Sequence, residues 1–391
     1  MIGLIQQIQR RTPLGWLQLN YEKSRLAVAI SGIAFADILM FMQLGFLTAL
    51  YDTNTLFHRS LKTDLVIISS EARELANMGT FSRRRLYQAM DVPGVKSAEA
   101  LYINNIEWQN PQTRRKTELL VAGVNPDHPV FNLPEVNQKL DQIKLPDTLL
   151  LDRASRGEYQ QVVAQINQGQ TVMTEIERRT VTVAGLFEIG SSFTSDGTLI
   201  TSDQNFLRLF PKREAGAVTL GLIELQSGYD PQQVAAVLNA TLPKDIRVLT
   251  YRGFVQFQED WITENQPISF VFGLGTLMGF IVGVVIVYQI LSTDVNDHKA
   301  EYATFKAMGY RNRYLLGVVF EEAVILAVLG FVPGVSVALG LYHITRNATA
   351  LPLAMPLMRV VLVLVLTIFM CALSGAIATR KLQSADPADI F

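Results

Sequence analysis

The stretch P-I-S-F-V-F-G-L-G-T-L-M-G-F-I-V-G-V-V-I-V-Y-Q-I-L, residues 267–291, decides the class of this protein. It contains no charged side chain from end to end. A helix rising about 1.5 Å per residue needs about 20 apolar residues to cross the hydrocarbon core of a bilayer. Because only a helix satisfies its own backbone amides inside hydrocarbon, this stretch predicts a membrane-spanning α-helix.

Three more apolar stretches of similar length occur at residues 26–50, 316–344 and 360–379. The four stretches together contain only three charged side chains, Asp37, Glu321 and Glu322. The whole chain of 391 residues is 18% charged, against roughly 25% in soluble proteins, and the stretches explain the shortfall. The composition therefore excludes a purely cytosolic enzyme and predicts an α-helical membrane protein with four transmembrane helices. A net charge of -1 gives no indication of nucleic-acid binding.

Lysine and arginine in the short segments predict the orientation, because cytoplasmic loops carry an excess of these residues. The N-terminal flank, the loop after the second stretch and the tail carry Arg10, Arg11, Lys23, Arg25, Lys299, Lys306, Arg311, Arg313, Arg380 and Lys381. The remaining short loop carries Arg346 and the boundary residue Arg359. We therefore expect both termini in the cytoplasm, the spans in the inner (plasma) membrane and the large domain in the periplasm.

These boundaries divide the chain into nine expected segments. Residues 1–24 place an apolar stripe against glutamine and arginine, which favours an amphipathic helix on the membrane surface over a simple lead-in to the first span. The others are transmembrane helix 1 (25–51), a periplasmic domain on a helical stalk (52–265), transmembrane helix 2 (266–291), a cytoplasmic coupling helix (292–314), transmembrane helix 3 (315–344), a short periplasmic loop (345–358), transmembrane helix 4 (359–380) and a cytoplasmic tail (381–391).

The large domain alternates strand-like and helix-like segments and is expected to be mixed α+β. Strands are predicted at residues 64–69, 98–108, 117–124, 148–152, 180–188, 198–202 and 218–226, and helices at 81–90, 203–210 and 230–240. The domain could form one body or two lobes joined by residues 125–146. Residues 51–62 and 254–266 carry apolar side chains at helical spacing, so we expect them to continue the first two spans as a stalk. The single cysteine, Cys371, lies in the last span, so the domain has no disulfide.

No motif for catalysis or metal binding is found in the sequence. The phosphate-binding pattern G-x-x-x-x-G-K-[ST] is absent, as are H-E-x-x-H and G-x-S-x-G. The four histidines, His58, His128, His298 and His343, are widely separated. We therefore expect no catalytic residue, no metal site and no cofactor bound by this chain.

Two features inside the spans predict helix packing. Gly275, Gly279 and Gly283 recur every four residues, which lets another helix approach closely. That helix could be the first span, which offers Gly32 and Ala36, or a helix of a second copy, although glycine is also simply common in membrane helices. Asp37 lies in the middle of a span, where a carboxylate is costly, so we expect an interhelical hydrogen bond or a proton-relay role.

The region between the second and third spans predicts a short amphipathic helix. Apolar side chains of the stretch 293–313 share one face, and Gly309 provides a C-terminal stop. Such a helix is either a surface connector or a docking element for a partner. The residues expected to contact a partner are His298, Glu301, Tyr302, Phe305, Lys306, Ala307, Met308 and Gly309. Glu321 and Glu322 begin the third span and are expected near the cytoplasmic headgroups, within reach of Arg311 or Arg313.

The order of one span, a large external domain and three spans, with the helix E-Y-A-T-F-K-A-M-G at 301–309, resembles the MacB, FtsX and LolE superfamily of ABC transporter permeases. In that superfamily the helix usually reads E-I-G-x-x-x-A-x-G. Glu301, Ala307 and Gly309 match this pattern, whereas Tyr302 and Ala303 replace the usual Ile-Gly.

A narrower resemblance, to the cyanobacterial DevC-type permeases, runs over essentially the whole chain. It is carried by G-W-L-Q-L-N at 15–20, F-A-D-I-L-M-F-M-Q-L-G-F at 35–46, I-T-S-D-Q-N-F-L-R-L-F at 200–210 and A-T-R-K-L-Q-S-A-D-P-A-D-I-F at 378–391.

The resemblance implies a non-catalytic subunit that pairs with a second copy of itself. Its implied partners are a DevA-like ATPase dimer that binds ATP and Mg, a DevB-like periplasmic adaptor and a TolC-like outer-membrane protein. In such a tripartite efflux system the permease transmits ATP-driven motion to its periplasmic domain, which pushes substrate, expected to be glycolipid from the membrane lipid, into the adaptor. The alternatives are an FtsX-like transducer that regulates a periplasmic cell-wall hydrolase and a secondary transporter that uses Asp37 as a proton site.

Overall fold

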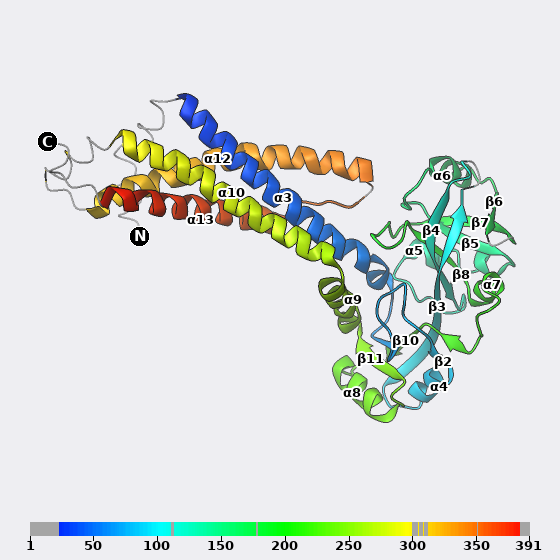
Figure 1. Cartoon of the computed structure of the whole chain (residues 1–391). Helices are drawn as coiled ribbons and strands as arrows, with labels where there is room; N and C mark the ends of the chain where they lie inside the picture. The colour runs from blue at the N-terminus through cyan, green and yellow to red at the C-terminus, as the bar shows by residue number, and fades with distance from the viewer. Residues whose placement is uncertain are drawn as a thin grey trace. The chain divides into compact units, whose positions relative to one another are not determined.

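The computed structural model describes residues 23–110, 113–176, 179–298, 304, 308, 312–349 and 351–383 (Figure 1). The chain divides into two compact units. The first, called the helical unit, comprises Met1–Ala49, Ile268–Ala348 and Leu353–Phe391. The second, called the α/β unit, comprises Leu50–Pro267 and Thr349–Pro352.

The helical unit is built from four long helices. They are α3 (Lys23–Ser60), α10 (Pro267–Asp297), α12 (Asn312–Thr349) and α13 (Leu357–Gln383). Each is long and apolar enough to cross a membrane, with mean hydropathies between 1.9 and 2.8 over the most apolar window. The predicted fold class, four transmembrane helices with a large mixed α+β domain, is therefore confirmed.

The helix ends differ from the expected segment boundaries. α10 continues to Asp297, into the region assigned to the coupling helix, and α12 already begins at Asn312 and continues to Thr349. α3 remains helical through Ser60, so the first half of the expected stalk is continuous with the first span.

The second half of the stalk is not continuous, and the prediction that it extends the second span was wrong. Helix α9 (Tyr251–Asn265) ends before Gln266, which has extended φ and ψ of -106° and 110°. The physical reason is Pro267, because its ring disfavours the α-helical conformation at the preceding residue. α9 and α10 are therefore two separate helices.

One sheet of nine strands forms the centre of the α/β unit, so of the two alternatives, one body or two lobes, the unit forms one body. The strand order is β11-β1-β10-β3-β4-β8-β5-β7-β6. The strands are β1 (Leu65–Ser69), β3 (Val95–Gln109), β4 (Lys116–Val124), β5 (Thr148–Asp152), β6 (Val172–Ile176), β7 (Arg179–Phe187), β8 (Thr198–Ser202), β10 (Leu220–Leu225) and β11 (Ile246–Thr250). A second, two-stranded sheet pairs β2 (Phe81–Ser82) with β9 (Ala217–Val218).

Helices cover both faces of the large sheet. The remaining elements of the unit are α4 (Arg84–Met90), α5 (Pro134–Asn137), η1 (Gln142–Lys144), α6 (Gln160–Asn167), α7 (Asp203–Leu209) and α8 (Pro231–Thr241). Side chains of α4, α6, α7 and α8 join one core cluster, and those of α5, η1, α9 and the end of α3 join the other. This explains why β1, β5 and β8 are buried along their whole length.

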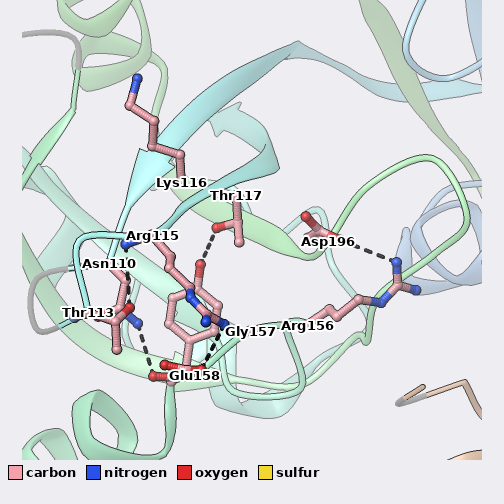
Figure 2. A pocket seen from close by; sticks show the side chains of 10 residues that line it. Asn110, Thr113, Arg115, Lys116, Thr117, Arg156, Gly157, Glu158 and Asp196 are labelled. Atoms are coloured by element: carbon pink, nitrogen blue, oxygen red, sulfur yellow. Dashed lines mark hydrogen bonds and ion pairs between the residues drawn. The ribbon is translucent and has the colours of Figure 1, made fainter. Parts of the chain in front are cut away.

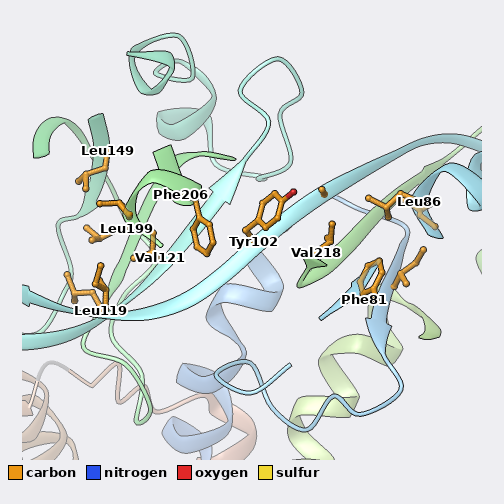
Figure 3. Packing of buried hydrophobic residues seen from close by; sticks show 14 of the residues in the cluster. Phe81, Leu86, Tyr102, Leu119, Val121, Leu149, Leu199, Phe206 and Val218 are labelled. Carbon is orange, nitrogen blue, oxygen red and sulfur yellow. The ribbon is translucent and has the colours of Figure 1, made fainter. Parts of the chain in front are cut away.

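Alternation along β3 shows how the sequence divides between the two faces. Tyr102 faces the first cluster, where its ring lies 5.6 Å from that of Phe206 of α7 (Figure 3). Leu101 and Ile103, its neighbours, face the second cluster. Side chains alternate in the same way along β4, where Val121 faces the first cluster and Leu120 faces the second.

Candidate functional site

The residues expected to contact a partner lie mostly outside the described part of the chain. Glu301, Tyr302, Phe305, Lys306, Ala307 and Gly309 are all outside it. His298 directly follows α10, with its Nδ1 3.0 Å from the carbonyl oxygen of Asp294, and Met308 is 61% exposed. The structure therefore fixes the two helix ends that lead into and out of this segment, at Asp297 and Asn312.

The glycine row of α10 faces α3. A methyl group at Gly275 would lie 2.5 Å from Cδ of Gln43, and one at Gly279 would lie 3.3 Å from Cβ of Leu39. A methyl group at Gly283 would lie 2.9 Å from Cβ of Ala36 and would also collide with Met370 of α13. At Gly283 the short contact is with Cβ of Ala36, so a methyl group there requires a shift of the helices. At Gly275 the contact is with the flexible end of the Gln43 side chain, which can move away.

Asp37 is completely buried where three helices meet. Its Oδ1 accepts a hydrogen bond from Oγ1 of Thr367 of α13 at 2.5 Å. On the other side, a methyl group at Gly334 of α12 would lie 2.9 Å from Cβ of Asp37. The structure thus places an interhelical hydrogen bond at this carboxyl group, in a site that is closed to water.

A cluster of charged residues joins α3, α10 and α12 at the N-terminal end of α3. We call it the Arg25 cluster, and it comprises Arg25, Asp294, Asp297, His298 and Glu322. Arg25 Nη2 lies 2.7 Å from Oδ2 of Asp297, and Arg25 Nη1 lies 3.7 Å from Oδ1 of Asp294. Nδ1 of His298 lies 3.6 Å from the same Asp294 oxygen. Glu322 is 1% exposed and its side chain contacts that of Asp294.

Glu322 was expected near the cytoplasmic headgroups, whereas the structure buries its side chain against α10. Because α12 starts at Asn312, Glu322 lies nearly three turns inside the helix and faces α10 rather than the surface. Glu321, the residue before Glu322, is half-buried. Arg311 and the side chain of Arg313 lie outside the described residues, so the pairing predicted for them stays a prediction.

A second polar cluster joins α3, α12 and α13 near the C-terminal end of α12. We call it the Arg359 cluster, and it comprises Phe41, Tyr342, Ala354 and Arg359. Nη1 of Arg359 donates to the carbonyl oxygen of Ala354 at 2.7 Å and to Oη of Tyr342 at 3.2 Å. Oη of Tyr342 donates in turn to the carbonyl oxygen of Phe41. Arg359 is 7% exposed, so this chain of hydrogen bonds holds a buried cation.

In the α/β unit, residues 51–60 of α3 are fastened to α9. The two hydroxyl oxygens of Tyr51 and Thr263 lie 2.9 Å apart, and Oη of Tyr251 donates to the carbonyl oxygen of Arg59 at 3.2 Å. The buried ring of His58 lies 4.5 Å from that of Phe254. These contacts tie the two helices to each other. In the chain, four residues separate α3 from β1, and β11 leads directly into α9.

A polar pocket of about 180 Å³ lies at the end of the β3–β4 hairpin (Figure 2). Its lining residues are Asn110, Thr113, Arg115, Lys116, Thr117, Arg156, Gly157, Glu158, Tyr159 and Asp196. The charged side chains pair with one another, with Arg115 Nη1 2.9 Å from Glu158 and Arg156 Nη1 3.3 Å from Asp196.

The hydroxyl groups of this pocket do not form a reactive arrangement. Tyr159 is hydrogen-bonded to Thr117, and burial raises the pKa of the Tyr159 hydroxyl. The Tyr159 hydroxyl is therefore not activated as a nucleophile near neutral pH. Among the described residues, no group of three or more His, Cys, Asp or Glu side chains could hold a metal ion.

Comparison with known proteins gives a family for the C-terminal part. Residues 273–387 match the family described as FtsX-like permease C-terminal. This match covers α12 and α13 with most of α10. No curated protein matches the chain.

Two solved structures are similar over about half of the chain. One is the periplasmic region of MacB from Actinobacillus actinomycetemcomitans, with 11% identity, 51% of this chain and 94% of that chain covered, and a TM-score of 0.34. The other is the extracellular domain of the noncanonic ABC-type transporter YknZ from Gram-positive bacteria, with 15% identity, 48% and 98% covered, and a TM-score of 0.31. TM-scores of this size support no conclusion about this chain.

Sequence reasoning missed most of both charged clusters. Asp294 was assigned to the cytoplasmic coupling helix at residues 292–314, and Phe41 and Tyr342 to apolar spans. The available signal was weak: polar side chains close to the ends of apolar stretches, which are usually solvated or in contact with headgroups. Only the extension of α10 to Asp297 and of α12 back to Asn312 brings Asp294 and Glu322 together.

Proposed function

We propose that this chain is the permease subunit of an ABC-type tripartite efflux system and that a separate ATPase supplies the energy. The observation that carries the proposal is the FtsX-like permease match at 273–387, in a chain with four membrane-length helices and a large α/β unit. The chain is then a non-catalytic subunit. Its helices gather polar side chains in the buried Arg25 and Arg359 clusters, an arrangement that suits an element transmitting motion better than a hydrophilic pore.

The proposed mechanism transmits motion along helices. The ATPase docks on residues 296–309, between the ends of α10 and α12, and its closure on ATP shifts those ends. α3 is one helix from the Arg25 cluster to Ser60, and residues 51–60 are bonded to α9. A displacement of α3 is therefore passed to β1 and β11, at one edge of the nine-stranded sheet.

The proposed assembly follows the resemblance to DevC-type permeases. It contains a second copy of this chain, a DevA-like ATPase dimer carrying ATP and Mg, a DevB-like adaptor and a TolC-like outer-membrane duct. Both termini lie in the cytoplasm and the α/β unit lies in the periplasm, as the distribution of Lys and Arg favours. The proposed cargo is a glycolipid taken from the membrane.

The test is co-purification of the full chain from its native membrane, followed by mass spectrometry of the partners and of the lipids that are lost on gene deletion. An ATPase together with a hairpin adaptor, and loss of a glycolipid from the envelope, are the expected results. Recovery of a cell-wall hydrolase without an adaptor would overturn export and favour the FtsX-like transducer, the alternative that the FtsX-like match also allows.

Two substitutions test the coupling segment. Glu301→Lys reverses a charge and Ala307→Trp adds bulk on the proposed docking helix, and each should reduce export about tenfold or more while the ATPase still hydrolyses ATP. Undiminished export with the ATPase still bound would reduce the segment to a connector. The secondary-transporter alternative makes a different prediction, since transport would then survive ATP depletion and fail in Asp37→Asn.

A further inference from the structure

Two carboxyl groups are buried against each other between α10 and α12. Glu322 is 1% exposed and Asp294 is 5% exposed, and their side chains lie within hydrogen-bonding reach of one another. In the part of the chain that the structure describes, no donor reaches either oxygen of Glu322 or Oδ2 of Asp294. If both groups were ionised, three buried carboxylate oxygens would have no hydrogen bond.

The surrounding charges do not compensate two ionised carboxylates. From α3, Arg25 faces Asp294 at 3.7 Å but makes its shorter contact, 2.7 Å, with the half-exposed Asp297. From α10, His298 lies 3.6 Å from Asp294, and from α12 the neighbouring Glu321 is half-buried. From α13, the buried polar side chains in this region among the described residues are the neutral Ser374 and Thr379, and Ala378 is apolar.

Two ionised carboxylates in contact repel each other, and burial in apolar surroundings makes that repulsion more costly. A single proton relieves this repulsion. It turns one carboxyl group into a hydrogen-bond donor and leaves the other as its acceptor. We propose that Asp294 and Glu322 bind one proton between them and form a carboxyl–carboxylate pair whose remaining negative charge is balanced by Arg25. A metal ion is a poorer occupant, because the guanidinium of Arg25 already faces the pair and would repel it.

The position of this pair between α10 and α12 means that the bound proton affects how the two helices pack. α10 ends at Asp297 and α12 begins at Asn312, so the pair links the last turn of α10 to the third turn of α12, on either side of residues 298–311. Loss of the proton would leave two like charges between these ends and would loosen their packing. The site therefore links proton binding to the position of the segment on which the ATPase is proposed to dock, although the pair itself does not depend on that function.

Infrared difference spectroscopy of the full-length protein in lipid tests the shared proton directly. The variants are Glu322→Gln, Asp294→Asn and the matched control Glu321→Gln. The wild-type minus Glu322→Gln spectrum should contain the band of a protonated carboxyl, and the wild-type minus Glu321→Gln spectrum should not. Asp37 is present in every sample, so its contribution cancels.

Asp294→Asn keeps the test decisive if Glu322→Gln does not fold. Its amide supplies a donor to an ionised Glu322, so the protonated band should again be lost.

A second measurement needs only wild type and Glu322→Gln. Raising the pH from about 6 to about 9 should lower the unfolding temperature of the wild type more than that of Glu322→Gln, since the folded wild type loses a proton. Difference spectra with carboxylate bands only, or equal pH dependence of the two proteins, would overturn the proposal.

Discussion

The two charged clusters of the helical unit differ in how completely their polar groups are satisfied. In the Arg359 cluster, the buried guanidinium donates to Ala354 and Tyr342, and Tyr342 donates to the backbone of α3. In the Arg25 cluster, buried carboxylate oxygens of Asp294 and Glu322 have no donor among the described residues. A network bonded through fixed donors holds one arrangement, whereas a carboxyl pair that depends on one shared proton can rearrange when that proton leaves. We infer that the Arg359 end of the bundle is fixed and the Arg25 end is adjustable.

The largest expected effect comes from breaking the fixed end. Arg359→Ala leaves the carbonyl oxygen of Ala354 and the hydroxyl of Tyr342 without their buried donor, so it should lower the free energy of unfolding by about 2–4 kcal/mol. Thermal unfolding in detergent measures the loss. The control is Arg346→Ala on the exposed side of α12, which should be close to neutral. Equal losses in both variants would show that the Arg359 cluster is not a clamp.

A smaller effect is expected between the two ends, at the contact of α10 with α3. Gly279→Leu inserts four carbon atoms where a single methyl group would already lie 3.3 Å from Leu39 and Met40, and it should cost about 1–3 kcal/mol. Gly273→Leu in the same helix is the control, because no atom lies within 4 Å of a methyl group there. If both substitutions are tolerated equally, the glycine row has no packing role in the monomer.

The smallest effect concerns an ion pair in the α/β unit and has the opposite pH dependence from that proposed for the Arg25 cluster. Hydrogen bonds from Lys96 and Lys62 lower the pKa of Glu224 in the folded state. Its stabilisation is therefore present at neutral pH and is lost as the pH falls through that lowered pKa. Since both lysines are well exposed, Glu224→Gln should cost less than about 1 kcal/mol.

Urea unfolding at neutral and acidic pH checks this last prediction, with Glu214→Gln, an exposed acid of the same unit, as the control. The difference between Glu224→Gln and wild type should shrink at acidic pH. A difference that grows as the pH falls would contradict the sign.

The sequence predicts the fold well where periodicity is strong and poorly where contacts are distant. The four spans and the strands β1, β3, β4, β5, β7, β8 and β10 lie close to their expected positions, because apolar runs and alternation are local signals. β11 and β6 were missed, since these short stretches carry Arg247 and Glu175 among their alternating apolar residues.

The polar contacts inside the bundle could not be predicted in the same way. That Asp37 is bonded to Thr367, 330 residues away, depends on the packing of α3 against α13 and on no local pattern. The same holds for Asp294 with Glu322 and for Arg359 with Tyr342. A burial pattern shows that a polar residue in a span needs a partner, but only the tertiary structure shows which partner it has.

The most direct test of the comparison measures how far each end of the bundle moves. Spin labels at Val28 and Phe320, both exposed, report the Arg25 end, and labels at Leu47 and Ile344 report the Arg359 end, each in a Cys371→Ala background. Distances are measured in the complex with the partner ATPase, with and without ATP. We predict a change in the Val28–Phe320 distance and none in the Leu47–Ile344 distance. Equal changes at both ends, or a change only at the Arg359 end, would contradict the account.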